Sequence, residues 1–154
     1  MIIAYVCYGS AHSSIVAASI HVGLLPMRKL PTYEEIISLP HYDITDGSQI
    51  GIPFYMGTDE FYNDVYAIGA KNGRKILIKA VYSFLEETAI SKDEIILIDA
   101  LPTIGLLTKI GGMASRRFKM VSIGRPITVY GILKKYDNFI KLVKEVKNKL
   151  EIKS

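Results

Sequence analysis

The pattern of apolar and polar positions predicts that the chain begins with a buried strand and a buried helix. Residues 2–7 (IIAYVC) are almost continuously apolar, which is typical of a strand covered on both faces. Residues 13–24 follow as a helix that is apolar on nearly all sides, ending at Gly23 and Pro26. This order places a short, polar loop between two elements of the core.

The rest of the chain continues the alternation of strands and helices, with turn or capping signals at the boundaries. The further predicted strands are residues 53–56, 64–68, 94–100 and 125–131. The further predicted helices are a short one between the capping box Thr32/Glu35 and Pro40, one over residues 74–88, and the terminal helix. Another helix is predicted from Thr103; Gly111 and Gly112 interrupt it, and it resumes through Arg117. This alternation predicts an α/β fold: a single three-layer α/β/α domain, residues 1–154, with a mainly parallel central sheet.

Composition supports a folded domain and excludes a disulfide scaffold. Of 154 residues, 49% are hydrophobic and Cys7 is the only cysteine. The longest apolar stretch, residues 15–25, contains Ser19 and His21 and is too short to span a membrane. The first residues carry no basic region typical of a signal peptide, so we expect a soluble, cytoplasmic protein.

The net charge of +4 is confined to residues 134–154, which hold seven lysines and three acidic residues. Apolar side chains recur there at helical spacing, and the lysines occupy the other faces. These apolar positions are Tyr136, Phe139, Val143, Val146 and Leu150. We interpret the segment as a docked helix with a solvated outer face and expect no nucleic-acid partner; a helix that docks another protein is the alternative. The high apolar content favours a homodimer but indicates no particular face.

The loop between the first strand and helix, residues 7–14 (CYGSAHSS), carries the strongest indication of function. Small residues let backbone N–H groups converge, and the following helix contributes its unsatisfied donors and positive end. Such a cradle binds anions, most commonly phosphate, and the helix end favours a thiolate at Cys7. The expected ligand-binding residues of this loop are Gly9, Ser10, Ala11, Ser13 and Ser14.

Local motif comparisons favour phosphate chemistry and disfavour a standard ATPase. The loop lacks the second glycine and the lysine of the Walker A pattern, although residues 94–100 (EIILIDA) look like a Walker B strand. It resembles the loop of low-molecular-weight tyrosine phosphatases and arsenate reductases, which have Cys, five residues, then Arg-Ser; here Ser13 and Ser14 stand at those positions. It is more similar to sugar phosphotransferase IIB components, whose pattern is Cys, five residues, Thr/Ser-Ser and whose cysteine carries the phosphoryl group. These resemblances imply a Rossmann-like or low-molecular-weight-phosphatase-like fold and a covalent role for Cys7.

Over its full length the chain resembles a different family. CYGSAHSSIVAASIHVGLLP, LIDALP, IGGMASRR and IGRPITVYG together are similar to a small bacterial family, a domain of unknown function found in spore-forming anaerobes. This resemblance implies no activity, cofactor or substrate.

Two further residues are candidates for catalysis. His12 lies within the loop and would act as acid, base or nucleophile near neutral pH; a capping histidine is the alternative. Asp99 ends a predicted central strand and would orient a substrate, bind a metal or hold a ribose. A helix-capping aspartate is an equally good interpretation of Asp99.

Arginines from other segments are candidates for the phosphate clamp that the loop lacks. Arg116 and Arg117 follow a flexible Gly-Gly segment, and Arg125 precedes a predicted strand. Surface ion pairs are the alternative role for these side chains.

The remaining polar residues indicate no metal site. His21 lies in an apolar helix and is best interpreted as a hydrogen-bonded core histidine. Asp59 and Glu60 could lie over the site, but an exposed turn explains them better. His41 and Asp43 belong to a polar loop, residues 41–51, that could lie near a site, but the histidines and the cysteine have no zinc spacing.

The sequence thus leads to two hypotheses and identifies no cofactor. The first is an enzyme or phosphate carrier for a small phosphorylated or anionic molecule, with Cys7, His12 and Asp99 in catalytic roles. The second is a regulatory module that binds a nucleotide or metabolite in the same cradle without chemistry.

Overall fold

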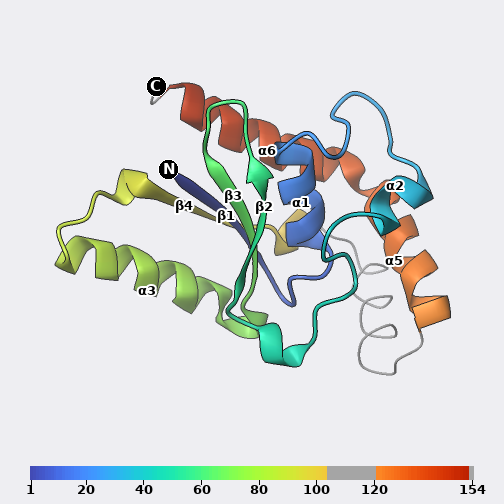
Figure 1. The fold of residues 1–154 in the computed structure, drawn as a ribbon, viewed down its shortest axis with the longest axis horizontal. Coiled ribbons are helices and arrows are strands. Elements are labelled where there is room, and N and C mark those ends of the chain that lie inside the picture. Colours follow the sequence, from blue (N-terminus) through green and yellow to red (C-terminus); the bar gives the residue numbers. More distant parts are fainter. Residues whose placement is uncertain (104–120, 153–154) are drawn as a thin grey trace.

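A computed structural model describes residues 1–103 and 121–152. The strands are β1 (Ile2–Cys7), β2 (Pro53–Thr58), β3 (Asp64–Gly69) and β4 (Ile95–Asp99). The helices are α1 (Ser13–His21), α2 (Tyr33–Ile37), α3 (Arg74–Glu87), α5 (Val121–Lys134) and α6 (Tyr136–Glu151), as Figure 1 shows. Short 3-10 turns lie at Gly47–Gln49, Lys71–Gly73, Lys92–Glu94 and Leu101–Thr103.

The four strands form one sheet in the order β2-β3-β1-β4. β1 pairs in parallel with β3 on one side and with β4 on the other. β2 pairs antiparallel to β3, with a register shift between Tyr55 and Gly57. The prediction of a mainly parallel sheet is therefore confirmed, with an antiparallel strand at one edge.

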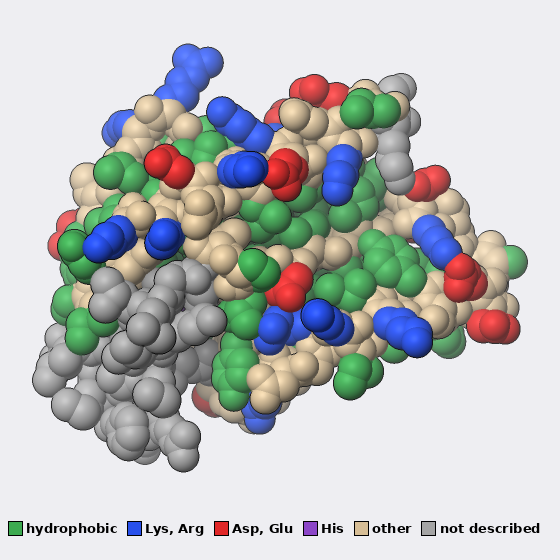
Figure 2. Space-filling model, turned by 180° about the vertical axis from the view of Figure 1, so that it is seen from behind, with side chains coloured by type: hydrophobic (Ala, Val, Ile, Leu, Met, Phe, Trp, Pro, Cys, Tyr) green, Lys and Arg blue, Asp and Glu red, His purple; other side chains and the backbone are tan. Residues whose placement is uncertain are grey.

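Helices cover both faces of this sheet, which confirms the three-layer architecture (Figure 1). Alternate residues of β1 point to opposite faces: Ile3 and Tyr5 join the main core with α1 and α6, while Ala4 and Val6 face α3. The α3 face has the smaller buried cluster. Apolar side chains are visible from behind between α6 and α3 (Figure 2). The main core therefore lies between the sheet and the α1/α6 layer.

The terminal helix packs as its periodicity predicts. The buried residues of α6 are those expected: Tyr136, Phe139, Val143, Val146 and Leu150. The hydroxyl of Tyr136 donates a hydrogen bond to the carbonyl of Pro26 (2.8 Å), which fixes the start of the helix against the segment after α1. Within residues 1–103 and 121–152, no helix has the length and apolar character needed to cross a membrane.

The predicted strand at residues 125–131 is wrong, because these residues form part of helix α5. The β-branched residues of ITVY favour a strand locally, but packing decides otherwise. In the helix, Thr128, Val129 and Ile132 all turn inward and are buried. Helix α1 also ends earlier than predicted, at His21, before Gly23 takes a positive φ of 80°. The helix predicted after Thr103 lies outside the described residues.

Candidate functional site

The connections of the sheet change face between β1 and β3. The chain leaves β1 for α1 on one face and leaves β3 for α3 on the other face (Figure 1). Ligands of open α/β sheets bind at the carboxyl ends of the strands, where the connections diverge in this way. Cys7 and Gly69 are register partners at the end of these two strands. The topology therefore directs attention to the loop that follows Cys7.

Neighbouring strands hold the end of β1 in place. The N–H of Ala100 donates to the carbonyl of Val6 (2.8 Å), and the N–H of Ala70 donates to that of Cys7 (2.9 Å). The N–H of Lys71 donates to the carbonyl of Tyr8 (2.8 Å). The loop thus begins from a backbone position fixed on both sides.

Cys7 lies buried at the base of the loop and is hydrogen-bonded to it. Its sulfur accepts the N–H of Ser10 (3.2 Å), and it lies 3.0 Å from the hydroxyl oxygen of Ser14 at the start of α1. Ser10 takes a positive φ of 51°, which turns the loop back over the sulfur. The sulfur is thus held between the loop and the start of α1.

The loop packs against the backbone of β3 at Gly69. A Cβ atom at this position would lie 2.8 Å from the hydroxyl oxygen of Ser10 and 2.9 Å from backbone atoms of Gly9 and Ser10. Only glycine permits this close approach without moving the loop. The curve of the loop therefore depends on a residue more than fifty positions away.

The amino end of α1 is not capped by the side chain of its N-cap residue. That residue is His12, whose ring makes no hydrogen bond to the first turn. Ser13 and Ser14 are buried there. A helix end with unsatisfied N–H groups favours an anion.

A buried carboxylate joins three distant segments beside this helix end. Asp43 Oδ1 lies 3.1 Å from Nε2 of His12, and Asp43 Oδ2 accepts the Nε–H of Arg125 in α5 (3.4 Å). The Asp43 side chain is only 1% exposed. Its backbone N–H also donates to the carbonyl of Ala11 (3.1 Å). We call His12, Asp43 and Arg125 the bridged cluster.

The polar loop of residues 41–51, which carries Asp43, also binds the backbone of the cradle. The hydroxyl of Thr45 donates to the carbonyls of Gly9 (2.9 Å) and Ser10 (3.2 Å). Sequence reasoning missed Asp43 and Thr45 as site residues, although residues 41–51 were expected to form a polar loop near a site. The polar, turn-rich composition of that loop was the available signal.

Two buried hydroxyls near the bridged cluster have no hydrogen-bond partner among residues 1–103 and 121–152. They are Ser10 Oγ in the cradle and Tyr42 Oη, whose ring packs edge-on against that of His12 with centroids 5.3 Å apart. Buried polar groups are nearly always hydrogen-bonded. Their presence here is consistent with a site for a polar ligand.

The other predicted residues lie elsewhere or outside the described part. Asp99 accepts the Nε–H of Arg74 (3.1 Å) and the N–H of Leu101 (3.0 Å), so within the described residues it binds α3 and the following turn. The second of these contacts fits the capping interpretation. Arg116 and Arg117 lie outside the described residues. Of the three candidate arginines, Arg125 is the one seen beside the loop.

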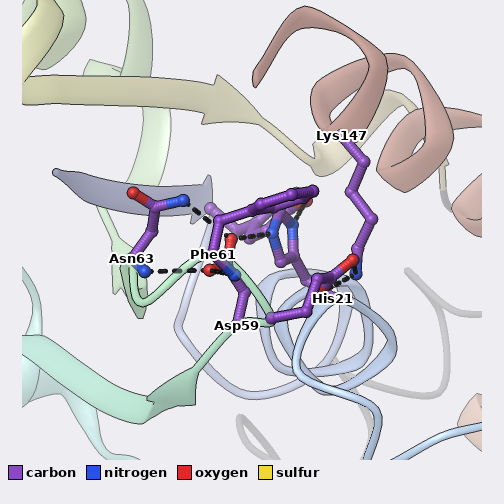
Figure 3. A network of polar contacts seen from close by, with 7 residues as sticks. His21, Asp59, Phe61, Asn63 and Lys147 are labelled. Atoms are coloured by element: carbon purple, nitrogen blue, oxygen red, sulfur yellow. Dashed lines mark hydrogen bonds and ion pairs between the residues drawn. The ribbon is translucent and has the colours of Figure 1, made fainter. Parts of the chain in front are cut away.

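A second polar network lies at the other end of α1 (Figure 3). The Tyr5 hydroxyl donates to Nδ1 of His21 (2.7 Å), and Nε2–H of His21 donates to Asp59 (3.1 Å). We assign this tautomer because the Asp59 carboxylate can only accept. Asp59 also accepts the N–H groups of Phe61 (2.9 Å) and Asn63 (2.8 Å). His21 is thus a hydrogen-bonded core histidine, as predicted.

The prediction of an exposed turn at Asp59 is wrong, because its carboxylate is buried against His21. Burial would raise the pKa of Asp59, but the hydrogen bonds from Asn63, His21 and Phe61 outweigh it and hold the pKa below its usual value. Burial lowers the pKa of His21 more than the Asp59 hydrogen bond raises it. The network thus consists of a neutral imidazole and a carboxylate. Glu60 remains exposed and pairs with Lys147 (2.6 Å).

Among residues 1–103 and 121–152, no group of three or more His, Cys, Asp or Glu side chains could hold a metal ion. The donor set of the cradle, which consists of N–H groups, hydroxyls and a guanidinium, suits an anion.

The fold and the loop define an α/β protein with a strand-loop-helix cradle at the carboxyl edge of its sheet. The chain belongs to the family described as "Protein of unknown function (DUF3189)", which it matches over residues 2–148. None of the curated proteins and none of the solved structures compared with the chain matches it significantly.

Gly69→Ala tests the contact between β3 and the cradle. We expect a loss of about 1–3 kcal/mol in the free energy of unfolding, because the new methyl group meets backbone atoms. Gly47→Ala is the matched control, since a Cβ there meets nothing within 4 Å. Denaturant unfolding measures both variants, and equal stabilities would contradict the close approach.

The His21 network predicts that acid destabilises the protein. In the unfolded chain, His21 binds a proton once the pH falls below its ordinary pKa of 6.5, whereas the lowered pKa in the folded chain opposes protonation there. The free energy of unfolding therefore falls as the pH drops below about 6.5. Asp59 adds a further loss below its ordinary pKa of 3.8. His21→Gln should flatten the dependence between pH 7 and 5, measured by urea unfolding. An unchanged slope in His21→Gln would refute this assignment.

Proposed function

We propose that the protein binds a small phosphorylated or otherwise anionic metabolite in the cradle formed by residues 7–14. The observation that carries the proposal is the bridged cluster, in which Asp43 holds Arg125 of α5 and His12 of the loop beside the amino end of α1. Backbone donors, a helix dipole and a guanidinium then act on the same small region.

The way in which Asp43 holds Arg125 supports a role in anion binding. Asp43 contacts the guanidinium at Nε, and within the described residues the two Nη groups make no hydrogen bond. These groups form the planar fork that binds phosphate oxygens in pairs. The negative charge of Asp43 is offset by the arginine, so it opposes an incoming anion less than an unpaired carboxylate would.

Phosphoryl transfer through Cys7 is the chemical form of this proposal, favoured by the two hydrogen-bond partners at its sulfur. The thiolate would attack phosphorus, forming an S–P bond as the bond to the leaving oxygen breaks, and His12 would supply the proton to that oxygen. Water would then attack the phosphocysteine, releasing inorganic phosphate and the thiolate. A regulatory module that binds the same ligand without chemistry is the second candidate, favoured by the absence of an arginine from the loop itself.

The binding proposal predicts that inorganic phosphate stabilises the protein through Arg125. Saturating phosphate should raise the Tm, since a ligand at about 100 times its Kd adds roughly 2.7 kcal/mol. Arg125→Gln should lose most of this shift, whereas Arg28→Gln, an exposed arginine beyond the opposite end of α1, should keep it. Differential scanning fluorimetry with phosphate and sulfate measures the shift. The absence of a shift in the unmodified protein would refute the cradle.

Cys7→Ser separates the two forms of the proposal. If Cys7 is a nucleophile, the intact unmodified protein treated with acetyl phosphate gains one phosphoryl group in its mass spectrum, and Cys7→Ser does not. If both proteins keep the phosphate-dependent Tm shift and neither is phosphorylated, the regulatory module is supported.

A further inference from the structure

Helix α3 exposes an apolar stripe on its outer side. Ile76 is 74% exposed and Phe84 is 66% exposed, and the small, exposed Ala80 lies between them at helical spacing. No residue of α3 is fully buried. The helix therefore has apolar side chains both toward the sheet and toward solvent.

The face of the sheet beneath α3 is also incompletely covered. Among the described residues, its cluster has three buried members: Ala4, Val6 and Leu97. Tyr66, Ile68 and Ile95 on the same side are only partly buried. The opposite face carries both α1 and α6 and a much larger buried cluster. Within the described residues, the α3 side is therefore the less covered side of the sheet.

The charges along α3 indicate which surface this is. Lys75 and Lys79 are exposed in its first half; in its last turn Glu87 is exposed, while Glu86 is paired with Lys92 of the same chain. Figure 2 shows basic side chains along one part of this helix and acidic ones toward its far end. An antiparallel copy of the same helix would bring opposite charges together, whereas a parallel copy would bring like charges together.

We propose that two copies of the chain form a dimer in which the α3 helices pack antiparallel. A two-fold axis near Ala80 would bury Ile76 and Phe84 of both copies, and the small side chain of Ala80 would let the helix axes approach closely. Residues equally far from Ala80 would face each other, so Lys75 of each copy would lie near Glu87 of its partner. The surface would then match itself in apolar character and in this pair of opposite charges.

Sedimentation equilibrium of the full chain tests the dimer and its interface. The unmodified protein should dimerise, and Phe84→Asp should raise the dimer Kd by at least about tenfold, because an aromatic side chain at an interface centre contributes strongly. Ile44→Asp is the matched control: Ile44 is 74% exposed but lies in the loop before β2, so its dimer Kd should not change. A monomeric unmodified protein, or a Phe84→Asp variant that dimerises normally, would overturn the proposal.

A charge exchange tests the antiparallel arrangement without removing apolar contacts. Lys75→Glu alone should weaken the dimer, since it places a negative charge near Glu87 of the other copy. Lys75→Glu combined with Glu87→Lys should restore it. If the double variant is as weak as the single variant, the helices do not pack in this direction. Far-UV circular dichroism of each variant confirms that the monomer is folded.

Discussion

The parallel pairing of β1 with strands on both sides is the constraint on which the rest of the structure depends. Because β1 bonds to β3 and to β4, both of its faces must be covered by apolar elements. The same pairing fixes where β1 ends, since N–H groups that follow the neighbouring strands bind its last carbonyls. The position of Cys7, and of the loop after it, therefore follows from the sheet.

Three long-range contacts then shape that loop. Gly69 lets it approach β3, Thr45 holds two of its carbonyls, and Asp43 links His12 to Arg125. None of these partners is near the loop in sequence. The shape of the cradle is thus a property of the whole fold, and the anion-binding function that we propose depends on it.

The sequence predicts the local features of this protein better than its long-range contacts. The apolar run of β1, the capping box at Thr32 and the spacing of buried residues in α6 are visible in short windows, and the structure confirms them. The β-branched residues within 125–131 favour a strand locally, but these residues belong to helix α5, where burial of Val129 and Ile132 overrides that preference. Asp43 and Asp59 were not identified as partners of His12 and His21, because 31 and 38 residues separate them.

The central claim is that the loop of residues 7–14 and Arg125 together hold an anion. A crystal structure of the protein grown with phosphate tests it most directly. We expect one phosphate at the amino end of α1, within hydrogen-bond distance of backbone N–H groups of the loop and of the Arg125 guanidinium. Crystals in which phosphate is absent from the loop, or binds there without Arg125, would contradict the account.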